Sequence, residues 1–243
     1  AYSVRKLDKD YTGNCMKVRR ASDDAEADIG FDSNGDLDTA AIATHCGASS
    51  GFVSVWYDMS GNANNATQST ASSQPQIYNG TAVITENGKP AVYTSSAGMA
   101  ASFTISSPFT FLSVMKTPTS GNRYILSWGG GLSPAVRNNA GNFNMYPGNH
   151  VIGSTVSNQG IYVAGYDAST GVAYGRINTA ETVSSNTASA FTAQNSGYIL
   201  SFSNAGGDSS SYVSEYIIWP SNQRSASNIA DIETDINTYF SIY

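Results

Sequence analysis

Short runs of β-branched and aromatic residues, separated by clusters of glycine, asparagine, serine and proline, recur along most of this sequence. The clearest runs are Phe52–Tyr57, Phe109–Met115, Ile161–Tyr166, Tyr198–Phe202 and Tyr212–Trp219. Runs of this length and composition favour strands, and the residues between them favour turns. The repeated pattern of strand, turn and strand predicts an all-β sandwich of antiparallel strands.

Two segments predict helices instead. Leu37–Thr44 is rich in alanine, and Asp38 is its candidate capping residue. Near the C-terminus, Ser225 or Ser227 can cap a second helix. The residues that recur at helical spacing after these serines are Ile229, Ile232, Ile236 and Tyr239. We expect this helix to close one edge of the sandwich.

No stretch has the composition of a linker, and no internal repeat is visible, so residues 1–243 are expected to form a single domain. The first residue is alanine rather than methionine, which suggests a piece of a longer protein. The apolar runs are all too short to span a bilayer, so no membrane insertion is expected.

Charged residues make up 12% of the chain and the net charge is −6. A nucleic-acid partner is therefore not expected, because phosphate neutralisation needs clustered lysine and arginine. The one basic cluster, Lys17 with Arg19 and Arg20, alternates with apolar residues and predicts the exposed side of a strand. Serine, threonine, asparagine and glycine must keep the surface polar, as in many surface-exposed β proteins.

The sequence predicts no cofactor. Asp32–Asp38 places side-chain oxygens at alternate positions, as calcium loops do, but the bidentate glutamate of such loops does not follow, so a tight turn is preferred over a calcium site. His45 and His150 lack the spacing of a metal pair. Cys15 and Cys46 either form a disulfide or remain buried thiols.

Three segments resemble known families. Ala1–Leu7, Val18–Asp24 and the Tyr-Asp-x-Ser-Gly-Asn run within Trp56–Gln68 occur in the same order in laminin-G-like, concanavalin A-like domains of phage virion and bacterial surface proteins. The second and third segments also resemble the catalytic sandwich of the arabinofuranosidase B family. Either resemblance implies a jelly-roll sandwich of two antiparallel sheets with a short C-terminal helix.

The second resemblance raises the question of catalysis, because retaining glycosidases use two carboxylates about 5–5.5 Å apart. The acid/base aspartate of the family lies in a glycine-rich loop after a late strand, where this chain has Ala205–Asp208. At the place of the nucleophilic glutamate, Gly141–Tyr146 offers only the amide Asn144. The cysteine pair of the family's sugar pocket is missing around Tyr124–Trp128. Since an amide cannot attack an anomeric carbon, whether the chain is an enzyme stays open, and the residues favour a negative answer.

Sugar binding needs aromatic faces together with amides and carboxylates. The candidate ligand-binding residues are Trp128, Asn144, Tyr146 and Asp208, because each lies in or beside a glycine-rich loop. Alternatively, Trp128 and Tyr146 fill the core. Trp56 and Trp219 are assigned to packing.

Two further motifs are interpreted as structural. Gly47–Gly51 matches the Gly-x-Ser-x-Gly of serine hydrolases by letters, but that motif needs a strand before it and a helix after it, and here the order is predicted to be reversed. The side chains of Asp58, Ser60, Asn62 and Asn64 are expected to bond to the backbone of their own turn.

Three functions are therefore compared. The first is a non-catalytic surface module of a phage virion that binds host glycan or neighbouring virion subunits. The second is a secreted glycoside hydrolase of α-L-arabinofuranosidase type with Asp208 as acid/base. The third is a structural spacer. All three place the chain on a virion surface or outside the cell, and oligomers are compatible with each.

Overall fold

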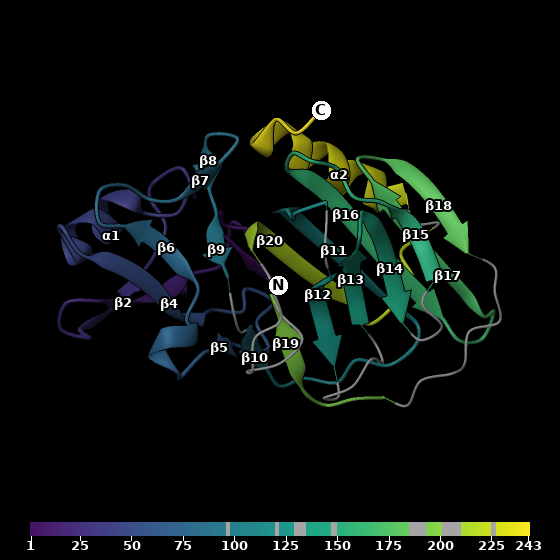
Figure 1. Ribbon diagram of the computed structural model, residues 1–243, viewed down its shortest axis with the longest axis horizontal. Coiled ribbons are helices and arrows are strands. Elements are labelled where there is room, and N and C mark those ends of the chain that lie inside the picture. The colour runs from purple at the N-terminus through teal and green to yellow at the C-terminus, as the bar shows by residue number, and fades with distance from the viewer. Residues whose placement is uncertain are drawn as a thin grey trace.

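A computed structural model describes residues 1–95, 98–119, 122–128, 135–146, 150–184, 193–200, 210–224 and 227–243 (Figure 1). The helices are α1 Thr39–Cys46, the 3₁₀ helix η1 Ala71–Ser73 and α2 Ser227–Phe240. The first ten strands are β1 Tyr2–Ser3, β2 Met16–Arg20, β3 Glu26–Ile29, β4 Ser50–Trp56, β5 Ala66–Thr67, β6 Gln76–Asn79, β7 Thr85–Glu86, β8 Lys89–Pro90, β9 Val92–Thr94 and β10 Met99–Ala101. The others are β11 Phe109–Lys116, β12 Asn122–Trp128, β13 Ala135–Asn139, β14 Asn142–Tyr146, β15 His150–Ser154, β16 Gly160–Asp167, β17 Val172–Ile177, β18 Ala180–Ser184, β19 Gly197–Ile199 and β20 Ser211–Trp219.

Eighteen of these strands form one large, nearly closed antiparallel sheet, and β7 and β8 form a separate hairpin. One arm of the sheet runs in the order β3, β2, β4, β6, β9, β20, β11, β16, β17 and β18. The other arm leaves β4 and runs through β5, β10, β19, β12, β13, β14 and β15. β1 pairs with β20.

The predicted all-β class and the C-terminal helix are confirmed, whereas two separate sheets are not seen. The reason lies in β4, whose first part pairs with β6 at Ser50–Phe52 and whose last part pairs with β5 at Val55 and Trp56. One bent strand thus belongs to both arms. Alternation along a strand shows which side chains are buried, but it carries no signal for such a crossing.

The two arms face each other across a shared core. The Tyr216 hydroxyl on β20 donates to the carbonyl of Ile125 on β12 at 3.0 Å. The rings of Phe143 on β14 and Tyr162 on β16 lie 5.2 Å apart in an edge-on arrangement. All three aromatic side chains are fully buried, and buried aromatic rings contribute a large share of the hydrophobic stabilisation of a core.

α1 begins as its capping residue predicts. The Asp38 carboxylate accepts a hydrogen bond from the backbone N–H of Ala41 at 2.9 Å, which satisfies one of the donors that a helix start leaves free. The helix ends before Gly47, whose φ of 57° is left-handed. Because Gly47–Gly51 follows a helix and leads into β4, the reversed order predicted for this motif is confirmed.

α2 lies against β16 and β17 (Figure 1). Ile229 and Ile236 are buried, as their spacing predicts. Glu233 on the same helix face is also fully buried, and its carboxylate accepts from the guanidinium of Arg176 on β17. The candidate cap Ser225 lies outside the described residues.

The two cysteines are buried thiols rather than a disulfide, and the acidic segment forms a tight turn. Cys15 and Cys46 are free and buried, and burial raises the pKa of both thiols. In the acidic turn, one Asp32 carboxylate oxygen accepts from the backbone N–H groups of Asn34 and Asp36. Within the described residues, no helix combines the length and the apolar character that a membrane span needs.

Candidate functional site: two groove-bearing surfaces of the sheet

The structure places three of the four predicted ligand-binding residues, Trp128 on β12 and Asn144 and Tyr146 on β14. Trp128 is fully buried at the end of β12, where its indole N–H donates to the Phe103 carbonyl at 2.8 Å. Its ring lies 4.5 Å from that of Phe103. A side chain on Gly197 would collide with the same indole. Trp128 therefore fills the core, which is the alternative considered for it above.

Of the other three candidates, Asn144 and Tyr146 lie on β14, and Asp208 is not described by the structure. Asn144 is buried on β14 and lies between Arg137 of β13 and Val151 of β15 in the strand register. Tyr146 occupies the register position opposite Ala135. Asp208 lies outside the described residues.

The distribution of carboxylates limits where hydrolysis can occur. The sequence has no aspartate or glutamate between Glu86 and Asp167, so β12, β13, β14 and β15 carry none. Every acidic residue except Asp208 falls within the described residues. A carboxylate that works with Asp208 must therefore come from outside these four strands.

Two of the buried carboxylates serve the core. Glu215 on β20 is fully buried and accepts from the Arg5 guanidinium and the Ser3 hydroxyl, each at 2.9 Å. Burial raises the pKa of Glu215, and the attraction of Arg5 only partly offsets this effect. Glu233 is held by Arg176 in the same way. Buried charges need such partners. Arg176 engages both oxygens of Glu233, whereas both hydrogen bonds to Glu215 end on Oε2, and its buried Oε1 has no hydrogen-bond partner among the described residues.

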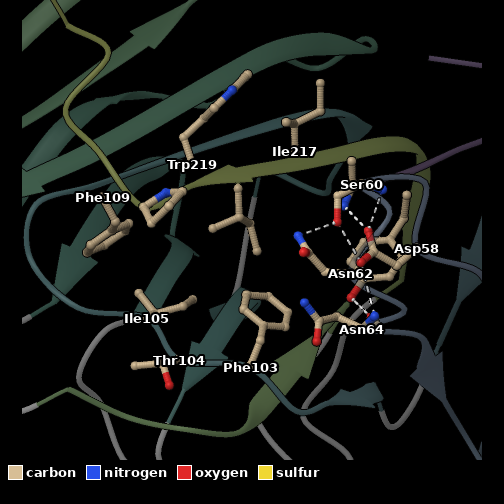
Figure 2. A pocket seen from close by; sticks show the side chains of 14 residues that line it. Asp58, Ser60, Asn62, Asn64, Phe103, Thr104, Ile105, Phe109, Ile217 and Trp219 are labelled. Atoms are coloured by element: carbon tan, nitrogen blue, oxygen red, sulfur yellow. Dashed lines mark hydrogen bonds and ion pairs between the residues drawn. The ribbon is translucent and has the colours of Figure 1, made fainter. Parts of the chain in front are cut away.

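A pocket of about 390 Å³ lies beside the Tyr-Asp-x-Ser-Gly-Asn turn (Figure 2). One wall is apolar and comes from two parts of the chain, the segment before β11 and the end of β20. The opposite wall is polar and comes from the turn. The residues labelled on these walls are Phe103, Thr104, Ile105, Phe109, Ile217 and Trp219, facing Asp58, Ser60, Asn62 and Asn64.

Asp58 in this pocket is engaged by its own turn and by the α-amino group of Ala1. One carboxylate oxygen accepts from the Ser60 backbone N–H at 3.0 Å and from the α-amino group of Ala1 at 2.6 Å. The other accepts from the Ser60 hydroxyl at 2.7 Å and the Asn64 N–H at 3.0 Å. Burial would raise the pKa of Asp58, but these hydrogen bonds and the amino group hold it below its usual value. With its lone pairs occupied, Asp58 orders the turn, which confirms the structural interpretation.

A second surface crosses strands β6, β9, β20 and β11 of the sheet. Gln76, Tyr93, Tyr212 and Lys116 are direct neighbours on β6, β9, β20 and β11, and we call them the tyrosine row. Directly paired residues of antiparallel strands lie on one face, and all four are half-buried. The two tyrosine rings lie 4.9 Å apart.

Two grooves border the tyrosine row. The first, of about 310 Å³, is lined by Lys116–Thr119, Ser157, Ser210 and Tyr212. The second, of about 410 Å³, runs along Gln76, Asn79, Val83–Glu86, Tyr93 and Tyr212. Ser210 and Tyr212, which line the first groove, follow Asp208 by two and four residues in the sequence.

Sequence reasoning missed the tyrosine row and Glu86. Each Glu86 carboxylate oxygen accepts from the Lys116 ammonium at 3.1 Å, and the same ammonium lies 5.6 Å from the Tyr212 ring centre. Tyr93 and Tyr212 are far apart in the sequence, and no local motif marks either of them. Only the pairing of β9 with β20 brings them together.

The comparisons with known proteins decide the family. Residues 1–123 match the family model described as "Alpha-L-arabinofuranosidase B, catalytic". The chain belongs to this family. A search of curated proteins found no sequence that matches this chain.

Solved structures share the fold of the chain. One is an arabinofuranosidase complexed with arabinofuranosyl-α-1,2-xylobiose, with TM-score 0.67, 16% identity and 97% of this chain covered against 61% of that one. A second is a GH54 α-L-arabinofuranosidase soaked with a cyclic sulfate inhibitor. Its TM-score is 0.62 and its sequence identity is 16%, and the match covers 89% of this chain and 58% of that chain. A third is a GH54 α-L-arabinofuranosidase variant with one glutamate replaced by glutamine, soaked with 4-nitrophenyl α-L-arabinofuranoside. Its TM-score is 0.64 and its sequence identity is 17%, and the match covers 90% of this chain and 58% of that chain. The chain thus spans about three fifths of their length.

The family match corrects the expectation of a non-catalytic phage virion module. Nothing in these comparisons points to a virus, so the virion surface and the virion subunits expected as partners are withdrawn with it. The error has a physical origin. The Tyr-Asp-x-Ser-Gly-Asn run that carried the resemblance is a self-bonded turn around Asp58, and a structural turn cannot distinguish two families that share it.

Proposed function

We propose that this chain is the catalytic domain of an extracellular glycoside hydrolase that removes α-L-arabinofuranosyl groups from a saccharide. The match of residues 1–123 to the arabinofuranosidase B catalytic family carries the proposal. The shared fold over nearly the whole chain supports it. The low content of charged residues suits a secreted β protein that acts on a neutral substrate.

Asp208 is the proposed general acid. It stands at the end of Ala205–Asp208, a glycine-rich segment similar to the family's acid/base loop. In this role it gives its proton to the glycosidic oxygen, and the saccharide leaves as an alcohol. A second carboxylate then either attacks the anomeric carbon or takes a proton from the water that does so.

Glu86 is the proposed second carboxylate. It lines the groove that Tyr212 borders, and Tyr212 follows Asp208 by only four residues in the sequence. The Lys116 ammonium donates to both of its oxygens at 3.1 Å, which holds the carboxylate in place beside the groove. The acid-free strands β12, β13, β14 and β15 offer no competitor.

Release of nitrophenol from 4-nitrophenyl α-L-arabinofuranoside tests the function. We expect turnover by the wild-type chain and a loss of about 10²–10⁴-fold in Asp208→Asn, the range typical of general acid catalysis. Asp10→Asn, at an exposed aspartate, is the matched control and should keep full activity. A wild-type chain without turnover on this and on arabinofuranosyl-substituted oligosaccharides would refute the proposed hydrolase.

The role of Glu86 has its own test. Glu86→Gln keeps the size of the side chain and removes its charge, so activity should fall by at least the factor seen for Asp208→Asn. The anomeric configuration of the first arabinose released, followed by NMR, then reports whether the second carboxylate attacks carbon or activates water. Full activity in Glu86→Gln would exclude Glu86 and leave the function itself standing.

A further inference from the structure

The tyrosine row provides apolar faces at a polar surface. Tyr93 and Tyr212 are tilted by 42° with respect to each other, and both line grooves rather than being sealed in the core. The same register continues from Gln76 to the half-buried Phe52 on β4. Neighbouring strands lie about 4.8 Å apart, so aromatic side chains recur along a line that crosses β4, β9 and β20.

Hydrogen-bonding groups flank these rings. Gln76 and Asn79 from β6 and Thr85 and Glu86 from β7 line the second groove. Thr117, Thr119 and Ser157 line the first groove. Aromatic faces beside amides, hydroxyls and a carboxylate suit a ligand that presents C–H surfaces and hydroxyl groups together.

The charges around the grooves select the class of ligand. Glu86 and Lys116 are the charged side chains among the described residues that line them, and they neutralise each other. An anionic polymer would need unpaired cations here, and a cationic one would need unpaired carboxylates. A neutral polyhydroxylated chain needs neither.

We propose that the tyrosine row and its two grooves bind the main chain of a neutral polysaccharide from which the arabinofuranosyl branch projects. The choice of a branched saccharide rests on the proposed function, whereas the site itself rests on the ring pair, the grooves and their neutral lining. Ser210 and Tyr212 of the first groove follow Asp208 closely in the sequence, which suits a main chain held near the branch that is cleaved.

Binding of soluble arabinoxylan to the whole chain, measured by calorimetry, tests the inference. Tyr93→Ala and Tyr212→Ala should each weaken binding about tenfold, since buried aromatic anchors dominate such surfaces. Tyr57→Ala, at a half-buried tyrosine that lines neither groove, is the matched control and should bind normally. Tyr212→Phe keeps the ring and should also bind normally.

A blocking variant keeps the test independent of folding. Thr85 is exposed and lines the second groove, so Thr85→Trp adds a ring to the groove without removing any core contact. We expect it to weaken arabinoxylan binding at least as much as Tyr93→Ala does. Arabinoxylan affinity that is unchanged in Thr85→Trp and in both tyrosine-to-alanine variants would overturn the inference, and so would a wild-type chain that does not bind arabinoxylan.

Two further measurements separate this inference from the proposed function. Turnover of 4-nitrophenyl α-L-arabinofuranoside, which has no main chain, measures the proposed hydrolase alone. Its absence in the wild type would refute the hydrolase and leave arabinoxylan binding to be judged alone. The affinity should also be the same at low and high salt, because a neutral ligand gains nothing from screened charges, and a strong salt dependence would contradict the ligand class.

Discussion

Glu233 of α2 and Arg176 of β17 form a two-point ion pair, with Nε to Oε1 at 3.0 Å and Nη2 to Oε2 at 2.7 Å. The Glu233 side chain is fully buried, and that of Arg176 is mostly buried. Two parallel hydrogen bonds between a guanidinium and a carboxylate are among the strongest polar contacts in proteins. This pair fastens the C-terminal helix to the edge of the sheet.

Breaking this pair should destabilise the chain. Glu233→Gln leaves the buried side of the Arg176 guanidinium without its carboxylate, and we expect a loss of about 2–4 kcal/mol in the free energy of unfolding. Urea denaturation followed by tryptophan fluorescence measures it. Asp231→Asn, at an exposed position of the same helix, should stay within about 0.5 kcal/mol, and equal losses in the two variants would contradict the assignment.

The buried Glu215 should make stability depend on pH. Because burial raises the pKa of Glu215 in the folded chain above its ordinary 4.5, the folded state binds this proton more tightly than the unfolded state does. The contribution of Glu215 is therefore most favourable below pH 4.5 and is lost as the pH rises through the raised pKa.

Glu215→Gln isolates this effect, because glutamine has no proton to lose. The free energy of unfolding of the wild type, relative to that of Glu215→Gln, should decrease as the pH rises from 4 towards neutrality. Denaturation curves of both proteins across this range give the difference. A difference that stays constant with pH would show that Glu215 titrates alike in the folded and unfolded states.

Asp58 should matter for stability rather than for chemistry. Asp58→Ala removes the acceptor for the backbone N–H groups of Ser60 and Asn64, and we expect a loss of about 2–4 kcal/mol. Asn62→Ala, in the exposed part of the same turn, should cost less than about 0.5 kcal/mol. Thermal unfolding compares the two, and a mild effect of Asp58→Ala would mean that other acceptors replace the carboxylate.

The two thiols should be unreactive in the folded chain. Cys15 is fully buried and its Sγ lies 3.1 Å from the Ser3 carbonyl oxygen, and burial raises the pKa of both thiols, so little thiolate forms at neutral pH. Ellman's reagent should label neither cysteine in the native protein and both after unfolding in denaturant. Absence of labelling in the unfolded protein would reveal a disulfide instead.

The parts of the fold that could be predicted are those set by local sequence. Runs of β-branched and aromatic residues located β11 and β16, Asp38 marked the start of α1, and the spacing of Ile229 and Ile236 identified the buried face of α2. Each depends on residues within a few positions of one another. Partner choice between strands depends on the whole chain, so the crossing through β4 had no local signal.

The candidate site was harder to predict for the same reason. Glycine-rich loops drew attention to Trp128, but the indole turns into the core, where Phe103 and Gly197 enclose it. The surface that brings Tyr93 beside Tyr212 depends on β9 pairing with β20, and the Glu86 to Lys116 contact depends on where the β7 to β8 hairpin packs. The predicted absence of a cofactor is untested, and a melting experiment with a calcium chelator addresses the calcium alternative at the acidic turn.

The division of β4 between the two arms has a consequence for how the molecule opens. Its first residues are held by β6 and its last by β5, while β2 pairs along much of its other edge. Neither arm can therefore separate from β4 without breaking backbone hydrogen bonds that also hold the other arm. We expect the amides of β4 to exchange with solvent only when both arms come apart, so that the two halves of the chain melt together.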